Sequence, residues 1–355
     1  METAQNALRP PKKTWRQSVN PDSVERQRTF FDTRVKHAKF DKLLDDLMPL
    51  LTPHSESNIV VITGATGVGK STLTRILLKA LFDDFSTTCD QDKSVIPLIA
   101  VEAYANGETR HSFRGLYEDM LVQLHEPARD KKAYPELEDG RMLIKQTSRA
   151  TIGMLRKSVE NALKNRKTQV CVVDEAYHMM RFGKDAAVMD TLKSLANTTG
   201  VKWVLVGSFD LFDLVSDHGQ IARRTSLLNL DRYRLEDSRD RAEFKQIVTK
   251  LQRKWPCQEV PNFAAISDEL LEVSLGCVGL LKSLLLDASA MQLGNAGAWK
   301  GDFLRKAAKA NTLRRVIAQE IEQGEAKVRG ALFGESFWDD QAFEALQNRM
   351  GGCHA

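Results

Sequence analysis

Several features that would place this chain in a specialised class are scarce or missing. Its 355 residues include only five cysteines, which are widely scattered and form no C-x-x-C pair. This pattern fits a reducing compartment and argues against a disulfide framework and a zinc site. No apolar run reaches the roughly 18 residues of a membrane-spanning helix, and the amino-terminal METAQNALRPPKKTW lacks the apolar centre of a secretion signal. We therefore expect a soluble protein of the cytoplasm with no membrane partner.

The positive charge of the chain is modest in total but concentrated in two places. The net charge is +4, and the composition is ordinary for a globular protein, with 42% hydrophobic and 28% charged residues. The first 42 residues carry ten Lys and Arg against five Asp and Glu, and residues 141–167 carry eight against one, Glu160. Concentrated positive charge suits a polyanionic partner, although a solvated helix face would produce the same pattern.

Apolar strands alternate with amphipathic helices over most of the chain. Strands are predicted at 58–64, 94–104, 169–174, 201–208 and 226–230, and helices at 23–51, 71–85, 113–124, 141–165, 185–198 and 211–223. The acidic stretch 126–140 is predicted to be a loop, and 141–165 is a single long basic helix in this interpretation. Strands separated by helices imply crossover connections, so we predict an α/β fold with a parallel sheet core covered on both faces.

The pattern changes near residue 237, beyond which no segment resembles a strand. Helical patterns occupy 239–255, 267–276, 279–293 and 302–322. We therefore divide the chain into a flexible basic arm (1–22), an α/β core (23–236), a small helical lid domain (237–328) and a tail (329–355). The tail contains Phe333, Phe337 and Trp338 and is a candidate partner-docking peptide, while a plain disordered terminus is the alternative.

Residues 64–72 read GATGVGKST and match the phosphate-binding pattern G-x-x-x-x-G-K-[ST]. Backbone N–H groups of such a loop wrap the β-phosphate, and Gly67 and Gly69 allow the unusual backbone angles that this requires. Lys70 is expected to bridge the β- and γ-phosphates of ATP, and the Ser71 hydroxyl to bind Mg²⁺. The predicted nucleotide-contacting residues of this loop are Gly64, Ala65, Thr66, Gly67, Val68, Gly69, Lys70, Ser71 and Thr72.

A second motif, VCVVDE at 170–175, places two acids at the carboxyl end of a predicted buried strand. Open α/β sheets bind their ligands at that edge. Asp174 is expected to hold Mg²⁺ through its water shell, opposite Ser71, and Glu175 to polarise an attacking water. P-loop kinases and Ras-like GTPases generally lack an acid at the second position. The pair therefore favours an ATPase that uses water as its nucleophile.

Three further positions are candidates for a role in ATP hydrolysis. Ser208 ends the strand 201–208 and either orients the water or is simply a turn residue. Arg223 or Arg224 can reach the γ-phosphate of a neighbouring subunit, where a trans arginine stabilises charge, or can be an ordinary surface residue. Lys282, near a helix start in the lid, is a candidate contact for the γ-phosphate.

Taken in order, these motifs resemble the AAA+ ATPases, over about residues 25–325. The shared features are GATGVGKST, CVVDE, a strand ending in VGS, paired arginines and G-x-x-K in a helical lid. The segments ETRHSFRGLYEDML, RATIGMLRKSVENAL and GCVGLLKSLLLDA make the chain similar, within this class, to the TniB/TnsC transposition regulators. The resemblance implies a P-loop NTPase fold of the AAA+ type. One departure is Lys282, since many AAA+ proteins use Arg there.

The resemblance also implies partners and a DNA-binding surface. TniB/TnsC proteins assemble on double-stranded DNA as ATP-bound homo-oligomeric rings or filaments, and they connect a targeting factor of the TniQ/TnsD kind to a transposase. Carried onto this chain, the DNA-facing candidates are Arg110, Arg114, Lys145, Arg149, Thr151 and Arg156. If 141–165 is one helix, Arg149 and Arg156 share a face, with Lys145 one turn earlier.

Alternatives to an ATP-driven DNA-binding switch remain at this stage. One is a scaffold that binds ATP for assembly but hydrolyses it little. Another is a P-loop kinase that phosphorylates a small molecule, which Glu175 and the helical lid argue against. A third is an AAA+ replication initiator or loader, for which the sequence shows no recognisable carboxyl-terminal winged helix.

Overall fold

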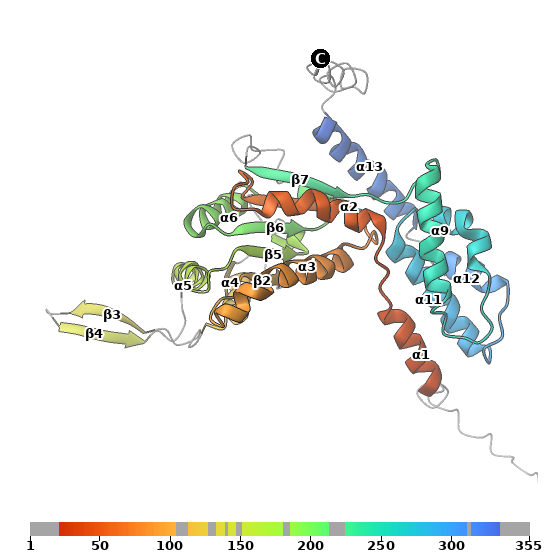
Figure 1. Cartoon of the computed structure of the whole chain (residues 1–355), viewed down its shortest axis with the longest axis horizontal. Helices are drawn as coiled ribbons and strands as arrows, with labels where there is room; N and C mark the ends of the chain where they lie inside the picture. Colours follow the sequence, from red (N-terminus) through yellow and green to blue (C-terminus); the bar gives the residue numbers. More distant parts are fainter. Residues whose placement is uncertain are drawn as a thin grey trace, which may run out of the picture. The chain divides into compact units, whose positions relative to one another are not determined.

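A five-stranded parallel sheet forms the core of the larger of the two units of the chain (Figure 1). The computed structural model describes residues 21–103, 113–126, 133–138, 141–146, 151–179, 185–212, 224–310 and 314–333. The strands of the sheet are β1 (Ile59–Gly64), β2 (Leu98–Glu102), β5 (Val170–Asp174), β6 (Lys202–Val206) and β7 (Thr225–Leu230). Their spatial order is β2-β5-β6-β1-β7, and every neighbouring pair is parallel, so all five carboxyl ends meet at one edge.

Both faces of this sheet are covered. Every residue of β1 and of β6 is buried, although successive side chains point to opposite faces of a strand. Mainly apolar strands that are buried on both faces are typical of the middle of a parallel sheet. The covering helices include α2 (Ala38–Leu47), α3 (Lys70–Gln91), α4 (Phe113–Gln123), α5 (Ile152–Asn165) and α6 (Asp185–Thr199). The short 3₁₀ turns are η1 (Met48–Leu51), η2 (Ala176–Met179) and η3 (Phe209–Phe212).

A two-stranded antiparallel hairpin lies between α4 and α5 in the chain. Its strands are β3 (Ala133–Glu138) and β4 (Arg141–Gln146), and Glu138 pairs with Arg141. The predicted loop at 126–140 is therefore wrong for 133–138, and the predicted helix at 141–165 is wrong for 141–146. Helix α5 begins only at Ile152, where the Thr151 hydroxyl accepts a hydrogen bond from Met154 N at 3.2 Å. Lys145, on β4, thus cannot share a helical face with Arg156.

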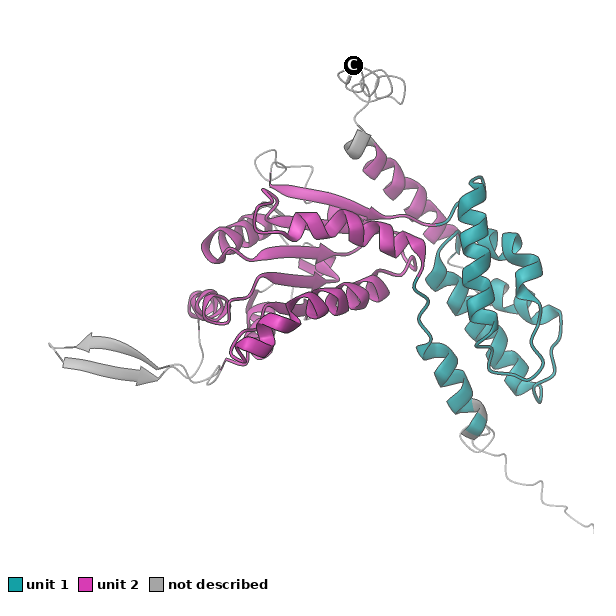
Figure 2. Ribbon diagram, viewed as in Figure 1, with its two compact units in different colours: residues 1–36, 233–314 teal, residues 37–232, 315–355 magenta. Residues whose placement is uncertain are grey.

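The chain forms two compact units, shown in Figure 2. The described residues of the sheet unit run from 37 to 232 and from 315 to 333, and those of the helical unit from 21 to 36 and from 233 to 314. The helical unit contains α1 (Pro21–Asp32), α9 (Ser238–Gln252), η4 (Phe263–Ile266), α10 (Ser267–Val273), α11 (Val278–Gly294) and α12 (Asp302–Ala310). The last helix, α13 (Arg314–Phe333), has residues 315–333 in the sheet unit.

Aromatic side chains form the core of the helical unit. The Trp255 ring packs edge-on against Phe30 and Phe263, with ring centroids 5.4 and 4.7 Å apart. Its indole N–H donates to Gln292 Oε1 at 2.8 Å, which satisfies the one polar atom of the ring. Because Phe30 comes from α1, this contact explains why α1 belongs to the helical unit rather than to the α/β core.

Most predicted elements are confirmed, and the exceptions are local. The parallel α/β core and the helical region that follows it are both present. The predicted helix 23–51 is interrupted at residues 33–37, and the predicted strand 94–104 is shorter, at Leu98–Glu102. In the predicted helix 211–223, only the end of η3 is described, and 213–223 lie outside the described residues. The arm 1–20 and the tail from 334 onward, including Phe337 and Trp338, also lie outside them.

Candidate nucleotide-binding site

The strand order brings three of the predicted motifs to the same edge of the sheet. The phosphate-binding loop follows β1, Ser208 follows β6, and Asp174 ends β5. Because the three strands are parallel neighbours, in the order β5-β6-β1, their carboxyl ends lie side by side. This edge is where open parallel sheets bind ligands.

The loop between β1 and α3 has the backbone of a phosphate cradle. Gly67 (φ 77°) and Gly69 (φ 119°) lie in the left-handed region, which glycine adopts without a Cβ penalty. Helix α3 begins directly after Gly69, at Lys70. A Cβ on Gly69 would also lie 3.1 Å from the Phe40 ring, so this ring of α2 packs against the loop. The sequence thus fixes both the turn and the start of the helix whose amino-terminal dipole favours an anion.

Lys70 lies over the loop that it closes. Its Nζ donates to the carbonyl oxygens of Gly64 and Ala65 at 2.9 and 3.0 Å. An ammonium held by main-chain oxygens keeps its charge at the mouth of the loop, where phosphate oxygens can replace the carbonyls. The lysine is therefore placed to bind a polyphosphate.

Asp174 and Glu175 form a tight acidic turn after β5. The backbone N–H of Glu175 donates to Asp174 Oδ1 at 2.9 Å. Glu175 has a φ of 50°, a left-handed conformation that non-glycine residues rarely adopt. Such strain is concentrated at functional sites. Here it directs two consecutive carboxylates to the same edge of the sheet.

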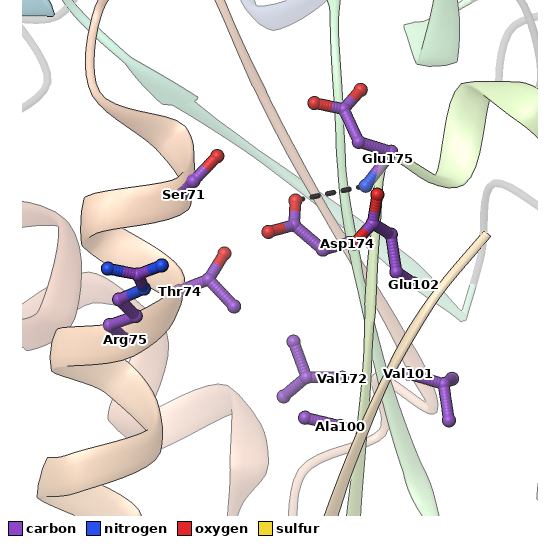
Figure 3. A pocket seen from close by; sticks show the side chains of 9 residues that line it. All are labelled: Ser71, Thr74, Arg75, Ala100, Val101, Glu102, Val172, Asp174 and Glu175. Atoms are coloured by element: carbon purple, nitrogen blue, oxygen red, sulfur yellow. Dashed lines mark hydrogen bonds between the residues drawn. The ribbon is translucent and has the colours of Figure 1, made fainter. Parts of the chain in front are cut away.

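One cavity of about 400 Å³ connects the two motifs (Figure 3). The side chains of Ser71 and Asp174 project toward one another across it. A hydroxyl and a carboxylate are ligands that Mg²⁺ prefers. Among the described residues, no group of three or more His, Cys, Asp and Glu is arranged to hold a metal, so Mg²⁺ would also need phosphate and water ligands here. The lining residues are Ser71, Thr74, Arg75, Ala100, Val101, Glu102, Val172, Asp174 and Glu175.

Two charged residues of this cavity were missed by the sequence reasoning. Glu102 ends β2 and pairs in register with Asp174, which places a third carboxylate at the same edge. Arg75 follows Ser71 by one turn of α3 and therefore lies on a neighbouring part of its surface. Both could have been found from the sequence: Glu102 as a polar residue that ends an apolar run, and Arg75 from its helical spacing.

The remaining ATP-site candidates lie in distinct places. Ser208 Oγ donates to Asp210 Oδ2 at 3.1 Å, next to the carboxyl end of β6. Arg224 is exposed and immediately precedes β7, so it lies at the opposite, amino edge of the sheet, where it donates to Asn197 Oδ1 at 3.3 Å. Arg223 lies outside the described residues.

Lys282 is engaged within the helical unit. Its Nζ donates to the carbonyl oxygens of Phe31 and Thr33, the latter at 2.6 Å, just beyond α1. Burial lowers the pKa of Lys282 to about 8, nearby Arg34 contributes in the same direction, and Asp32 opposes the shift. In this structure the lysine therefore ties α1 to α11.

The DNA-facing candidates that the structure describes lie on α4, on β4 and at or on α5. Arg114 pairs with Glu118 at 3.3 Å on α4, and Thr151 caps α5. Lys145 is on β4, in the hairpin. Arg110 and Arg149 lie outside the described residues.

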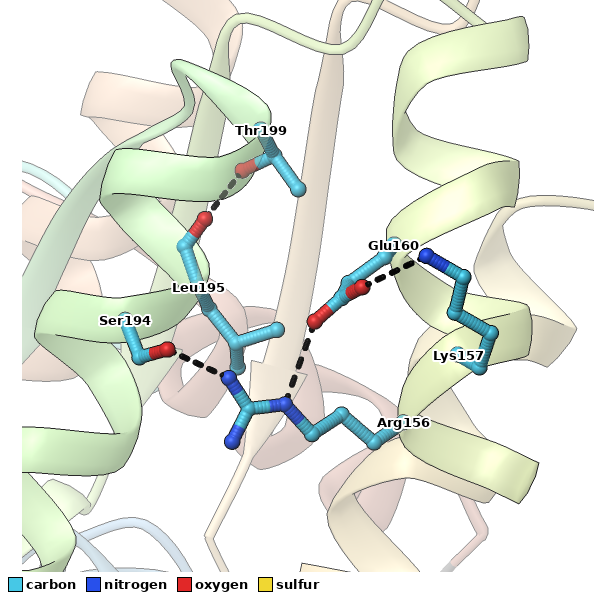
Figure 4. A network of polar contacts seen from close by, with 6 residues as sticks. All are labelled: Arg156, Lys157, Glu160, Ser194, Leu195 and Thr199. Atoms are coloured by element: carbon cyan, nitrogen blue, oxygen red, sulfur yellow. Dashed lines mark hydrogen bonds and ion pairs between the residues drawn. The ribbon is translucent and has the colours of Figure 1, made fainter. Parts of the chain in front are cut away.

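Arg156 is built into a polar network between α5 and α6 (Figure 4). Its guanidinium donates to Glu160 Oε1 at 3.1 Å and to Ser194 Oγ at 2.6 Å. Lys157 also donates to the Glu160 carboxylate, at 3.4 Å. Burial acts to raise the pKa of Glu160, but the hydrogen bonds from Arg156 and Lys157 outweigh it, and the net shift is downward. Arg156 therefore connects α5 to α6 through hydrogen bonds to Glu160 and Ser194.

The parallel five-stranded sheet, the phosphate-binding loop and the acidic strand end together define a P-loop fold of the AAA+ class. Residues 54–215 match the AAA domain family. No curated protein matches the chain in sequence. No helix in the described part of the chain combines the length and hydropathy that a membrane crossing needs.

Solved structures of three other proteins share this fold. The Aeropyrum pernix ORC1 protein in complex with DNA aligns with a TM-score of 0.54 at 15% identity, over 82% of this chain and 70% of that chain. Cdc6p from Pyrobaculum aerophilum aligns with a TM-score of 0.53 at 14% identity, over 91% and 88%. The Aeropyrum pernix ORC2 protein, in ADPNP–ADP complexes, aligns with a TM-score of 0.50 at 14% identity, over 86% and 70%. At these identities the likeness concerns the fold.

Proposed function

We propose that this protein binds and hydrolyses ATP at the cavity between α3 and the carboxyl ends of β2 and β5. The observation that carries this proposal is the position of Ser71 opposite Asp174 and Glu175 in one cavity. A hydroxyl at the start of the helix and two acids at the strand end are the parts that metal-assisted phosphoryl transfer to water requires.

Each side chain then has a defined task. The N–H groups of the loop and the Lys70 ammonium bind the phosphates, and Ser71 and Asp174 are the residues that would hold Mg²⁺. When bound, this ion neutralises charge on the β- and γ-phosphates. Glu175 accepts a hydrogen bond from the attacking water and orients it. Ser208, which follows the strand β6 between β1 and β5, contacts the same water or the γ-phosphate in this proposal.

We further propose that ATP binding assembles the protein on double-stranded DNA, where it links a targeting protein of the TniQ/TnsD kind to a transposase, and that hydrolysis disassembles the oligomer. The resemblance to the TniB/TnsC regulators in the basic and lid segments supports this function. The concentrated positive charge of 141–167 supports a polyanionic partner. A ring or filament is the expected form.

A replication initiator or loader is the second candidate. The observation that favours it is the fold shared with ORC1 and Cdc6p, since the ORC1 structure contains DNA. In the described residues that follow the lid region, α13 is a single helix, and a winged-helix domain is not among them. A third possibility, a DNA scaffold with little hydrolysis, uses the same site.

Imaging with duplex DNA tests the proposal. Wild-type protein with a non-hydrolysable ATP analogue should form ordered rings or filaments on the duplex, and Lys70→Ala should not, because it removes the charge that binds the phosphates. Nucleotide-independent coating of DNA by Lys70→Ala would contradict the proposal.

Glu175→Gln tests the role of hydrolysis: the variant should still assemble and should stay on DNA longer than the wild type. An unchanged residence time on DNA, with hydrolysis abolished, would favour the scaffold. Nucleotide binding without DNA binding would instead favour a P-loop kinase.

A further inference from the structure

Helix α13 packs on the sheet unit, although it follows the helical unit in the chain. Ile321 and Val328 are 3% and 4% exposed, and Gly324 lies between them on the same stripe. Residues on the other side of the helix, such as Val316 and Glu322, are exposed. The helix is therefore docked along one face.

The docked face lies against the segment that follows β6. A Cβ on Gly324 would come within 2.1 Å of the Phe209 ring, so the helix backbone rests directly on that ring. Phe209 is the residue after Ser208, which is at the ligand edge of the sheet. Glycine at 324 thus allows α13 to approach this edge more closely than any other residue would.

An ion pair fixes the same helix to the end of β7. Arg232 Nε donates to Glu325 Oε1 at 2.8 Å, and Arg232 Nη2 donates to Glu325 Oε2 at 3.3 Å. The two side chains are 25% and 12% exposed, so the pair is largely removed from water. Bidentate geometry of this kind fixes orientation as well as distance.

Glu320 connects α13 to the phosphate-binding loop itself. The Thr66 hydroxyl donates to Glu320 Oε1 at 2.7 Å. Thr66 is the third residue of GATGVGKST. A carboxylate therefore lies beside a loop whose proposed ligand carries several negative charges.

We propose that Glu320 is a positioning residue that makes the docking of α13 sensitive to the charge in the phosphate-binding loop. The hydrogen bond from Thr66 to Glu320 stabilises the docked position of α13. A triphosphate adds negative charge beside the carboxylate, which weakens this contact and loosens α13. Because linkage is reciprocal, a docked α13 must lower the affinity for the triphosphate by the same factor. The inference rests on the proposed nucleotide binding.

The effect of the nucleotide is expected first in the amino-terminal part of the docked face, around Glu320. Phe209 and Arg232 hold α13 independently of the loop, so loss of the Thr66 contact frees the amino-terminal half of the docked face first. The stability of this part of α13 would then differ between the protein with and without ATP. The ATP state would thereby be reported outside the site.

Glu320→Gln is the informative variant, because the amide keeps an oxygen that can accept from Thr66 and removes the charge. We expect it to tighten binding of a non-hydrolysable ATP analogue by about threefold, a size typical of a partly screened like-charge contact. The gain should be smaller for ADP, which carries less charge, and should shrink at high salt. Glu322→Gln is the matched control, since Glu322 is an exposed acid two residues further along the same helix, and it should leave the affinity unchanged.

Hydrogen exchange provides the second readout. In the wild type, the ATP analogue should speed exchange of the α13 amides, and Glu320→Gln should remove this response. The inference would be overturned if wild type and Glu320→Gln bound the ATP analogue with equal affinity, or if the analogue did not change hydrogen exchange in α13. Either result would leave the proposed ATP binding intact. If the wild type binds no nucleotide at all, the proposed function fails as well.

Discussion

Among single side chains, Arg156 is a basic residue that makes hydrogen bonds inside the fold. It lies in a segment of high positive charge, and the resemblance to DNA-binding regulators makes it a candidate phosphate contact. In the structure it bridges α5 and α6 through Glu160 and Ser194, and its side chain is 31% exposed. The neighbouring Lys157 side chain is 68% exposed and keeps most of its surface in water. Substituting each residue in turn therefore compares the stability contributed by a half-buried arginine with that contributed by an exposed lysine.

Arg156→Ala should lower the free energy of unfolding by about 1–3 kcal/mol, because it leaves the Glu160 carboxylate buried without its main donor. Lys157→Ala is the control and should cost well under about 1 kcal/mol, as exposed ion pairs usually do. Urea unfolding without DNA measures both. Equal small losses for the two variants would show that the network contributes little to stability.

The same network predicts a pH dependence. The pKa of Glu160 in the folded state lies below its ordinary value of 4.5. A carboxyl with a depressed folded pKa stabilises the protein above its unfolded pKa and loses that contribution as the pH falls through the folded value. The stability difference between wild type and Glu160→Gln should therefore be full at pH 7 and should shrink below pH 4.5. A difference that stays constant down to pH 3 would contradict this assignment.

At the level of helices and strands, the hairpin β3–β4 shows where sequence reasoning reached its limit. Basic charge and apolar residues over 141–165 predict one helix, whereas the residues just before this segment carry a signal for a turn. Asp139-Gly140 stands between two short runs, and this dipeptide is a strong hairpin signal. Basic residues occur in strands as well as in helices, so the charge pattern cannot show that α5 begins only at Ile152.

The core strands and the phosphate-binding motifs were predictable because local pattern and spacing determine them. β1, β5 and β6 are short continuous apolar runs, and the loop 64–72 has a fixed spacing with glycines at its left-handed positions. The break at residues 33–37 and the docking of α13 were not predictable. Both depend on contacts between residues distant in sequence, such as Phe30 with Trp255 and Gly324 with Phe209.

The turn between α10 and α11 contains a glycine that no other residue can replace. Gly276 has a φ of 73°, and a Cβ there would lie 1.8 Å from the carbonyl oxygen of Tyr233, which is main chain and cannot rotate away. Gly276→Ala should therefore cost about 3 kcal/mol or more, measured by thermal unfolding. Gly294→Ala is the control: nothing lies within 4 Å of its Cβ, and it should be neutral or slightly stabilising. Similar melting temperatures for the two variants would contradict the close approach.

For the whole molecule, the position of Arg224 bears on how subunits cooperate. Arg224 precedes β7, and Asn58 at the start of β1 donates its backbone N–H to the Arg224 carbonyl oxygen. The phosphate-binding loop follows the other end of β1, a strand of six residues, or about 20 Å at 3.3 Å per residue. Arg224 lies at the amino edge of the sheet and is therefore too far from the phosphate-binding loop of its own subunit to contact a nucleotide there. If it acts in hydrolysis, it does so on the ATP of a neighbour.

Mixing two inactive variants tests this arrangement. Arg224→Ala keeps an intact site but supplies no arginine, and Glu175→Gln binds ATP and supplies the arginine but cannot activate water. Each alone should lose at least tenfold in ATPase rate on DNA, in line with the effect of trans arginines. In an equimolar mixture, about one interface in four combines an intact site with an intact arginine in a head-to-tail assembly, so activity should recover to about a quarter of the wild-type rate.

A second mixture serves as the control for that recovery. Arg224→Ala combined with the double variant Arg224→Ala/Glu175→Gln contains no subunit with the arginine, so it should remain inactive at every ratio. Recovery in the first mixture alone would place Arg224 in a site shared between subunits, and it would require an oligomer in which the amino edge of one sheet meets the ligand edge of the next. A wild-type rate for Arg224→Ala by itself would remove Arg224 from the reaction and leave Arg223 as the candidate.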